Sequence, residues 1–414
     1  MSTYSQSSVR TGWAIAVIAF VQSVLTNALP RTDKTLPLRE DLRYWHVLIG
    51  LLLFAVLVIR LRVWWREERG IAPLGGLRPG LFNWGRALAL ASYLLLLSMP
   101  VFGFLFAWGG GTRVGIPGLL TFPALTGESY RLWLFSGYFH SAVGFMGLLL
   151  YTATLITAAY GWLRYGKGLL TVLPPGFGVQ ALLAMANTSW ALATFKSPDP
   201  GPAAVARFAA LVLVIWGVGW LLARRRQPGE SASEPAGKNR MASAMGALIL
   251  LALGSYGPYA MFRVAPWPMG DVIAGPPGVT SHTAPVTRVQ GWAETDYERK
   301  VAIETYKWCG FCHTYVKGGK TKAGPNLYAI FGQRIASVPN FHYSPALASR
   351  RDGVWDDATL DALLADSDKF APGTTMIISS GPVSDPKVRR AVINMLKRDT
   401  MPGAVDMMPA PEGQ

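Results

Sequence analysis

Two cysteines and a histidine stand together in the last third of the chain. Cys309 and Cys312 are three residues apart, and His313 follows directly, which gives the pattern C-x-x-C-H. Two thiols at this spacing can each form a thioether with a haem vinyl group, and the adjacent imidazole then reaches the iron. A thioredoxin-like C-x-x-C would need a surrounding βαβ unit, whereas the preceding segment 297–308 has helical spacing. The sequence therefore predicts covalent attachment of one haem c.

A second iron ligand for this haem is expected downstream of His313. The strongest candidate is Met376, at the end of the segment Pro372–Met376. Methionine paired with histidine raises the reduction potential, which suits an electron acceptor. His342 is the alternative donor, and the simplest structural interpretation of Met376 is a loop side chain that fills a gap in the core. We predict that His313 and Met376 form the axial pair.

Two further histidines, His46 and His140, are the only ones in the apolar half of the chain. They fall near the starts of the second and fourth apolar runs. In an up-and-down bundle these two helices run parallel, so both imidazoles should lie at a similar depth. Imidazoles on facing helices can hold a haem iron, and an ionisable side chain within a membrane is a functional hypothesis by default. The structural alternatives are a hydrated His46 at the interface and a His140 that bonds a neighbouring backbone group.

The elements that must position these residues are membrane helices. Hydrophobic residues make up 51% of the chain and charged residues 15%, and the long apolar runs all precede Val264. A membrane-spanning helix needs about 20 mostly apolar residues. We predict seven spans: Gly12–Leu29, Tyr44–Leu61, Leu88–Trp108, Trp133–Tyr160, Gly176–Phe195, Ala203–Ala223 and Met241–Phe262. The fifth is the weakest because it contains Gln180 and three other polar residues, so six helices are the alternative.

The formal net charge of +15 indicates membrane orientation and not nucleic-acid binding. Arginines gather in the segment Arg60–Arg78, which we expect to be a loop, and in Arg224–Arg226, with Lys238 and Arg240 following. Positive charge beside membrane spans marks the cytoplasmic side. Both segments lie there if the N-terminus is inside and seven helices cross, which leaves the C-terminal domain outside the cytoplasm. The first run lacks a convincing cleavage site, so we expect a retained helix and not a signal peptide.

A segment rich in proline and glycine joins the two halves of the chain. The stretch Ala265–Val289 should form an extended tether with a mean reach of about 25–30 Å, which keeps the C-terminal domain near the membrane surface. His282 lies in this tether and is expected to be solvated. The predicted units are two sets of membrane helices, the linker, a C-terminal domain and a disordered tail: 1–175, 176–263, 264–295, 296–400 and 401–414.

Four segments of the first 175 residues stand in a characteristic order: Arg43–Gly50, Val58–Leu61, Tyr93–Gly103 and Phe139–His140. Together they resemble the bacterial cytochrome b561 family, which commonly holds two haems b. This chain lacks one expected histidine around Gly12 and Trp13, and another near Thr154. The resemblance therefore implies a single haem b, held by His46 and His140 on the outer side, and no complete electron path across the membrane.

The C-terminal domain carries a second set of ordered motifs: Cys309–His313, Gly324–Leu327, Phe331–Gly332, Phe341–Ala346, Trp355, Pro372–Met376 and a final helix, Pro386–Lys397. From about Asp296 to Arg398 the chain resembles a class I cytochrome c of the mitochondrial type. The resemblance implies that the Pro325 carbonyl accepts a hydrogen bond from His313, and that Tyr343 and Trp355 bond a haem propionate. For these two aromatic residues the structural alternative is a plain place in the core.

These expectations combine into an all-α protein of the bacterial cytoplasmic membrane, with its cytochrome c domain in the periplasm. Electrons should pass from membrane quinol through haem b to haem c, and then to a soluble or membrane acceptor. This describes an electron carrier with a possible quinol–cytochrome c oxidoreductase activity. Two alternatives remain open, namely an anchoring relay subunit of a periplasmic dehydrogenase and an enzyme that oxidises superoxide. The expected partners are quinol, a periplasmic redox protein and lipid, without nucleic acid.

Overall fold

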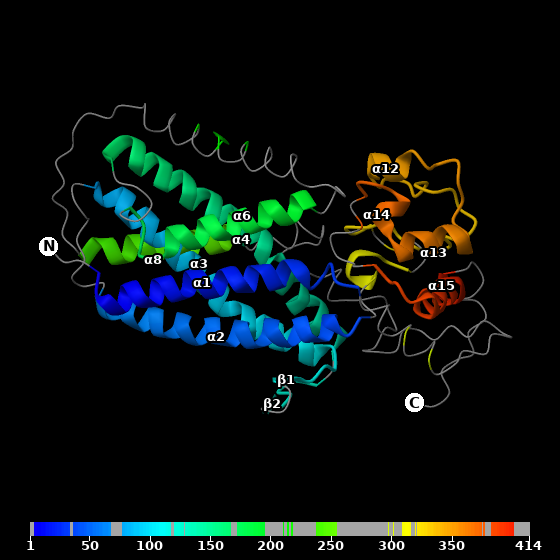
Figure 1. The fold of residues 1–414 in the computed structure, drawn as a ribbon, viewed down its shortest axis with the longest axis horizontal. Helices are drawn as coiled ribbons and strands as arrows, with labels where there is room; N and C mark the ends of the chain where they lie inside the picture. The colour runs from blue at the N-terminus through cyan, green and yellow to red at the C-terminus, as the bar shows by residue number, and fades with distance from the viewer. Residues whose placement is uncertain are drawn as a thin grey trace.

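The structure is a computed structural model, in which a bundle of long helices carries a smaller C-terminal domain at one end (Figure 1). It describes residues 4–33, 36–67, 77–116, 120–127, 129–166, 172–194, 237–254, 309–315, 321–374 and 382–400, with single positions at 210, 213, 214, 217, 297, 301, 319 and 376. The predicted linker 264–295 and the predicted tail 401–414 lie outside these residues.

The bundle is built from helices that run up and down beside one another. They are α1 (Gln6–Ala28), α2 (Leu38–Glu67), α3 (Pro79–Gly109), α4 (Tyr130–Tyr165), α6 (Phe177–Thr194) and α8 (Gly237–Gly254). Helix α3 packs against α4 and α8, and α1 packs against α2 and α6. The predicted all-α fold class is confirmed. One small antiparallel hairpin between α3 and α4 was not predicted; it pairs β1 (Val114–Ile116) with β2 (Leu120–Phe122).

Four of the described helices, α1 to α4, are long and apolar enough to cross a membrane. They coincide with the first four predicted spans. The fifth and seventh predicted spans fall on α6 and α8, and the sixth, Ala203–Ala223, lies outside the described residues except at four positions. The total of seven therefore stays a prediction.

The bundle has two ends of different character. Helices α1 and α3 end, and α2 and α4 begin, at the end that faces the C-terminal domain, called here the domain-side end; the opposite end is the far end (Figure 1). Helix α6 runs parallel to α1, since Gly12 approaches Pro175 at the far end and the Asn187 amide donates to Ser23 Oγ at 3.0 Å. Ser243 donates to the Asn83 carbonyl, so α8 begins at the far end as well. This is the arrangement that a seven-helix topology requires.

The expected loop Arg60–Arg78 is shorter than predicted. Arg60 lies inside α2 and is fully buried, and its Nη1 donates to the Ser8 carbonyl of α1 at 3.2 Å. Its guanidinium also lies 5.3 Å from the ring centre of Trp64, and that of Arg86 lies 4.4 Å from the same ring. Cations over aromatic faces are attracted by the ring quadrupole. At least these two charges hold α1, α2 and α3 together inside the bundle.

Polar residues of the weak fifth span face other helices. Gln180 is almost fully buried, and its side-chain amide donates to the Tyr151 hydroxyl of α4 at 2.9 Å. Asn187 makes the bond to Ser23 already described. Because a polar group is tolerated in a membrane when another helix satisfies it, these residues are compatible with a spanning helix.

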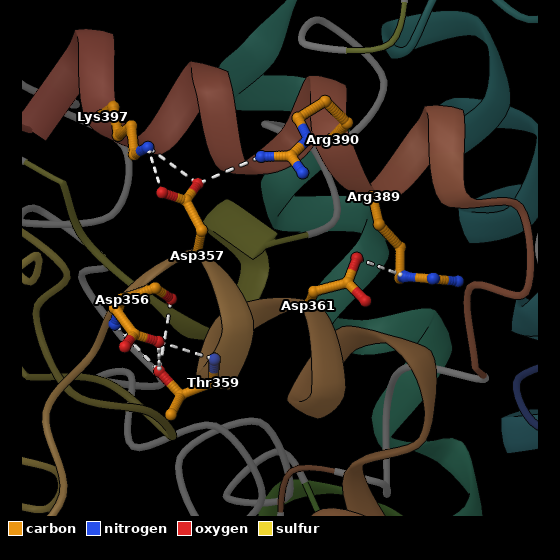
Figure 2. A network of polar contacts seen from close by, with 7 residues as sticks. All are labelled: Asp356, Asp357, Thr359, Asp361, Arg389, Arg390 and Lys397. Carbon is orange, nitrogen blue, oxygen red and sulfur yellow. Dashed lines mark hydrogen bonds and ion pairs between the residues drawn. The ribbon is translucent and has the colours of Figure 1, made fainter.

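The C-terminal domain consists of short helices and loops around its own core. Its helices are α12 (Pro345–Ala348), α13 (Asp357–Ala365), α14 (Ser367–Phe370) and α15 (Pro386–Thr400). Asp356 caps α13 by accepting from the Thr359 amide, while Thr359 accepts from the Asp356 amide, and both bonds are 2.8 Å long. Ion pairs from α15 to Asp357 and Asp361 fix α15 across α13 (Figure 2). The predicted final helix is present and continues to Thr400.

Candidate functional site

Residues 309–312 of the C-x-x-C-H segment are helical, and His313 follows them directly. The His313 amide donates to the Cys309 carbonyl at 2.8 Å, and the side chains of both cysteines are partly buried. His313 Nδ1 lies 2.7 Å from the Pro325 carbonyl oxygen. A carbonyl can only accept, so Nδ1 carries the proton and Nε2 is left as the metal-binding nitrogen.

The surroundings of His313 suit a metal-binding imidazole. A Cβ atom at Gly324 would lie 2.6 Å from His313 Nδ1 and 2.7 Å from Nε2, so only glycine allows the ring to lie flat against the chain here. The Gly324 amide also donates to the Cys312 carbonyl at 2.8 Å. Burial lowers the pKa of His313, although the Pro325 bond opposes this shift. The neutral form that binds a metal is therefore favoured.

A partly buried lysine supports the same turn. Lys322 Nζ donates to the Gly310 carbonyl oxygen, between the two cysteines, at 2.7 Å. Burial lowers the pKa of Lys322 to about 8, and the nearby Cys312 opposes this shift. Lys322 was not singled out by sequence analysis, because a lysine ten residues after Cys312 carries no signal by itself.

The remaining predicted haem c residues gather around two adjoining clusters. Met376 is partly buried against a core that includes Trp355, while Cys309 packs against a second core that includes Met395. Leu327 and Phe331 contact both clusters. The attachment motif and Met376 are therefore close to one continuous apolar lining, which fits a flat apolar group.

The predicted propionate partners have local roles in the structure. Trp355 is buried in the core cluster, and the Tyr343 hydroxyl accepts from the Val338 amide at 3.3 Å. Burial raises the pKa of Tyr343, so it keeps its proton and stays a donor. His342, the alternative iron ligand, is exposed at the surface.

The two histidines of the bundle lie next to each other at the domain-side end. The ring centres of His46 and His140 are 5.9 Å apart, and the rings are nearly perpendicular at 83°. Two imidazoles that bind one iron from opposite sides have centres roughly 6 Å apart, since each metal–nitrogen bond is about 2 Å. The spacing therefore fits a haem iron. His140 Nδ1 lies 3.1 Å from the Met99 carbonyl, which again leaves Nε2 for a metal.

Small and polar neighbours shape the space around this pair. A Cβ at Gly103 would lie 3.1 Å from His140 Cε1, so glycine makes room for the ring. The Gln22 amide nitrogen lies 3.0 Å from His46 Nδ1, while Gln22 Oε1 is buried without a partner. The same amide nitrogen donates to the His46 carbonyl oxygen at 3.2 Å, so Gln22 ties α1 to α2 through both the ring and the backbone of His46. Sequence analysis missed Gln22, which stands in no motif, and it included Gly103 only as the last residue of the segment Tyr93–Gly103.

The positions where histidines are missing have other roles. A Cβ at Gly12 would lie 2.9 Å from the Pro175 carbonyl carbon, so a larger side chain at this position would clash with the turn before α6. Thr154 is fully buried, and its hydroxyl donates to the Leu150 carbonyl at 2.7 Å. Neither position offers a metal ligand at the far end of the bundle.

Comparison with known proteins gives a clear result for part of the chain. No family model matches it. A cytochrome c homolog of Rickettsia felis is 40% identical over 119 residues, which is 28% of this chain and 64% of that protein. Cytochrome c of Arabidopsis thaliana is 36% identical over 93 residues, or 22% of this chain and 80% of that protein. Cytochrome c of Cochliobolus lunatus is 34% identical over 93 residues and is covered to 82%.

The extent of these matches limits what they establish. The chain spans 52% to 64% of the length of the Rickettsia relatives it matches. Each match covers about a quarter of this chain, a length comparable to the predicted C-terminal domain 296–400. These relatives support a covalently attached haem and a redox partner protein.

Proposed function

The chain belongs to the cytochrome c family, and from that premise we propose that it is a membrane-bound electron-transfer protein with one haem c and one haem b. The haem c would be attached to Cys309 and Cys312, with His313 and Met376 as axial ligands. Each haem supplies, when bound, an iron that exchanges one electron at a time between its ferrous and ferric states.

The observation that carries the haem b assignment is the pairing of His46 and His140. Their ring centres are 5.9 Å apart, and His140 Nδ1 is engaged by the Met99 carbonyl. Both residues lie near the starts of α2 and α4, at the domain-side end of the bundle. The resemblance of the first 175 residues to the cytochrome b561 family supports the same assignment.

The other predicted site residues take supporting roles in this proposal. The Pro325 carbonyl holds the His313 ring and fixes its tautomer. Tyr343 and Trp355 would bond a propionate at the apolar lining. His313, held neutral by burial, provides the lone pair that binds iron.

Membrane quinol is the proposed electron donor, and a soluble or membrane redox protein the proposed acceptor. Oxidation of one quinol releases two electrons and two protons, so two single-electron passages consume one quinol. We place the protein in the bacterial cytoplasmic membrane, with its C-terminal domain in the periplasm. We propose quinol as the donor because both proposed iron sites lie at one end of the bundle, where a quinol from the bilayer can approach.

The first prediction concerns haem content. A pyridine haemochrome spectrum of the purified full-length chain should give equal amounts of haem b and haem c. His46→Ala or His140→Ala should remove the haem b signal and leave haem c unchanged, because each variant removes one of two axial ligands. His342→Ala, at an exposed histidine, is the matched control and should leave both signals intact.

Stopped-flow mixing with a quinol tests the donor. The unaltered chain should show haem c reduction, and His140→Ala should lose it.

Two haems b per haem c would contradict the ligand assignment. A chain with both haems that does not react with quinol would contradict the donor alone, and co-purification of a stoichiometric dehydrogenase would then favour the relay-subunit alternative.

A further inference from the structure

One side chain of the haem-attachment motif is buried against the membrane bundle. Phe311, between the two cysteines, is 5% exposed. Its ring centre lies 4.5 Å from that of Tyr138 and 5.7 Å from that of Trp133. The Tyr138 hydroxyl also donates to the Phe311 carbonyl oxygen at 3.0 Å. Both partners lie in the first three turns of α4, so the attachment turn rests on the domain-side end of the bundle.

The surface that receives Phe311 is made of three aromatic side chains, Phe106, Trp133 and Tyr138, called here the aromatic seat. The Phe106 and Trp133 rings are stacked, with centres 5.4 Å apart at 29°. Gly137 leaves the space for the contact, because a Cβ there would lie 2.6 Å from the Phe106 ring and 2.9 Å from the Phe311 ring. A close fit of this kind is the mark of a specific interface.

The aromatic seat continues directly to the histidine pair. The Phe106 ring lies nearly parallel to the His140 ring, at 27° with centres 6.5 Å apart. The same ring lies 6.4 Å from that of Phe311. Phe106 therefore contacts both the proposed haem b ligand and the haem c attachment turn, so a single side chain connects the two sites.

A second contact fixes how the domain is turned on the bundle. The Ser384 amide donates to Asp33 Oδ2, in the connection between α1 and α2, at 2.9 Å. Arg389 Nη1 donates to the Val383 and Ser384 carbonyls at 3.0 Å and 2.8 Å, which holds this loop in place. Two contacts at separate points define one orientation, whereas a single contact would leave the domain free to pivot.

We propose that the aromatic seat is the docking site of this chain's own C-terminal domain, with Phe311 as the positioning residue that holds the two iron sites together. The electron-transfer part of this inference rests on the proposed function. In that step one electron leaves the iron held by His46 and His140, which changes from ferrous to ferric. The iron held by His313 changes from ferric to ferrous, quinol supplies the electron, and no atom is exchanged between the sites.

Photo-crosslinking of the full-length chain tests the docking directly. Phe311→p-benzoylphenylalanine should cross-link, within one chain, to the segment 133–138, as mapped by mass spectrometry. Because the contact is apolar, its yield should hold when salt is raised from about 0.05 M to about 0.5 M. The same substitution at Tyr297, an aromatic residue of this domain that is 47% exposed, is the control and should give no such product. Cross-links between two chains, or to other segments only, would overturn the inference.

The rate of haem c reduction after mixing with quinol tests the positioning role. Phe311→Ala should lower the ratio of docked to undocked domain about tenfold or more, and slow the reduction, while haem c content stays unchanged. Tyr297→Ala should leave the rate as it is. An unchanged rate in Phe311→Ala would refute the positioning role.

The two proposals fail in different ways. Cross-linking from position 311 to the seat in a chain without haem b supports the docking and overturns the proposed function. Equal haem b and haem c without that cross-link overturns the docking and leaves the proposed function standing.

Discussion

At the scale of single residues, two of the candidate ligands share one feature. His313 and His140 each have Nδ1 against a backbone carbonyl, from Pro325 and Met99 respectively, at 2.7 Å and 3.1 Å. A backbone carbonyl cannot donate, so both rings have a fixed tautomer with Nε2 unprotonated. A ring held this way loses little freedom when it binds iron, which favours retention of the metal.

Gly324 offers a sharp test of the His313 site. Gly324→Ala would place a methyl group 2.6 Å from His313 Nδ1, and the ring would have to shift. Overpacking of this kind costs roughly 1–3 kcal/mol. We expect the C-terminal domain of the full-length chain to unfold at a lower guanidinium concentration. The haem absorption band measures this midpoint.

Gly353→Ala is the matched control for this test. Its new Cβ would lie 3.1 Å from Ile335 Cδ1, the far end of a flexible side chain. The neighbour can move, so the midpoint should change less than for Gly324→Ala. Equal effects of the two variants would show that close contact with the imidazole is not what requires glycine at position 324.

The site could be predicted from sequence where its chemistry is local or where helix direction brings two residues to the same depth. The C-x-x-C-H spacing is local because thioether formation and ligation involve five consecutive residues, and the His46–His140 pairing followed from helix direction. Phe311 and Gln22 could not be found in the same way. The role of each depends on a neighbour far along the chain, Tyr138 for the first and His46 for the second.

At the scale of helices and strands, hydropathy located the first four spans but not their ends. The predicted span Leu88–Trp108 became α3 (Pro79–Gly109), because Asn83 and Arg86 lie against other helices and not in water. The same cause placed Arg60 within α2 and not in a loop. A hydropathy profile treats every charged residue as solvent-facing, so it ends a helix too early wherever such a residue is buried against protein.

Two neighbouring arginines of α15 provide a prediction about the C-terminal domain. Arg389 is 13% exposed on its side chain, and it bonds Asp361 at 2.8 Å (Figure 2). It also donates to two carbonyls of the preceding loop. Arg389→Ala should lower the free energy of unfolding by roughly 1–2 kcal/mol, mostly through the lost bonds to Asp361 and to the Val383 and Ser384 carbonyls. Thermal unfolding of the full-length chain, followed at the haem band, measures the change.

Arg390→Ala is the control next to it. The Arg390 side chain is 63% exposed, and its one ion pair with a residue that the structure describes is with Asp357, at 3.3 Å (Figure 2). Exposed ion pairs contribute about 0–1 kcal/mol, and salt screens them. A loss in Arg390→Ala as large as in Arg389→Ala would mean that ion pairing, and not the support of the 383–384 loop, holds α15 in place.

At the scale of the whole molecule, the bundle is asymmetric. The described histidines of the bundle lie at the domain-side end, whereas the far end contains the buried cations Arg60 and Arg86 around Trp64. Gly12 packs against the turn before α6 and leaves no room for a histidine. Any electron path through this chain is therefore expected to begin and end on the side of the C-terminal domain. None of this follows from composition, because the same residue counts would suit a symmetric bundle.

Lengthening the linker tests whether the C-terminal domain is held on the aromatic seat or is only attached through the linker. Doubling residues 264–295 with a glycine–serine insert should lower the effective concentration of the domain about threefold, from the three-halves power of loop length. If the aromatic seat keeps the domain docked most of the time, a threefold change leaves the docked fraction nearly unaltered. The reduction rate of haem c in the otherwise unaltered chain should therefore change little.

The same insert should have a larger effect when it is combined with Phe311→Ala. If the ratio of docked to undocked domain is about ten in the unaltered chain, Phe311→Ala lowers it to about one. A further threefold loss should then roughly halve the docked fraction and the rate. The insert should therefore slow haem c reduction more in Phe311→Ala than in the chain that retains Phe311. Stopped-flow rates of the unaltered chain, the two single variants and their combination measure this coupling. A threefold loss from the insert in the chain that retains Phe311 would mean that the tether, and not the contact with Tyr138 and Trp133, sets how often the two iron sites meet.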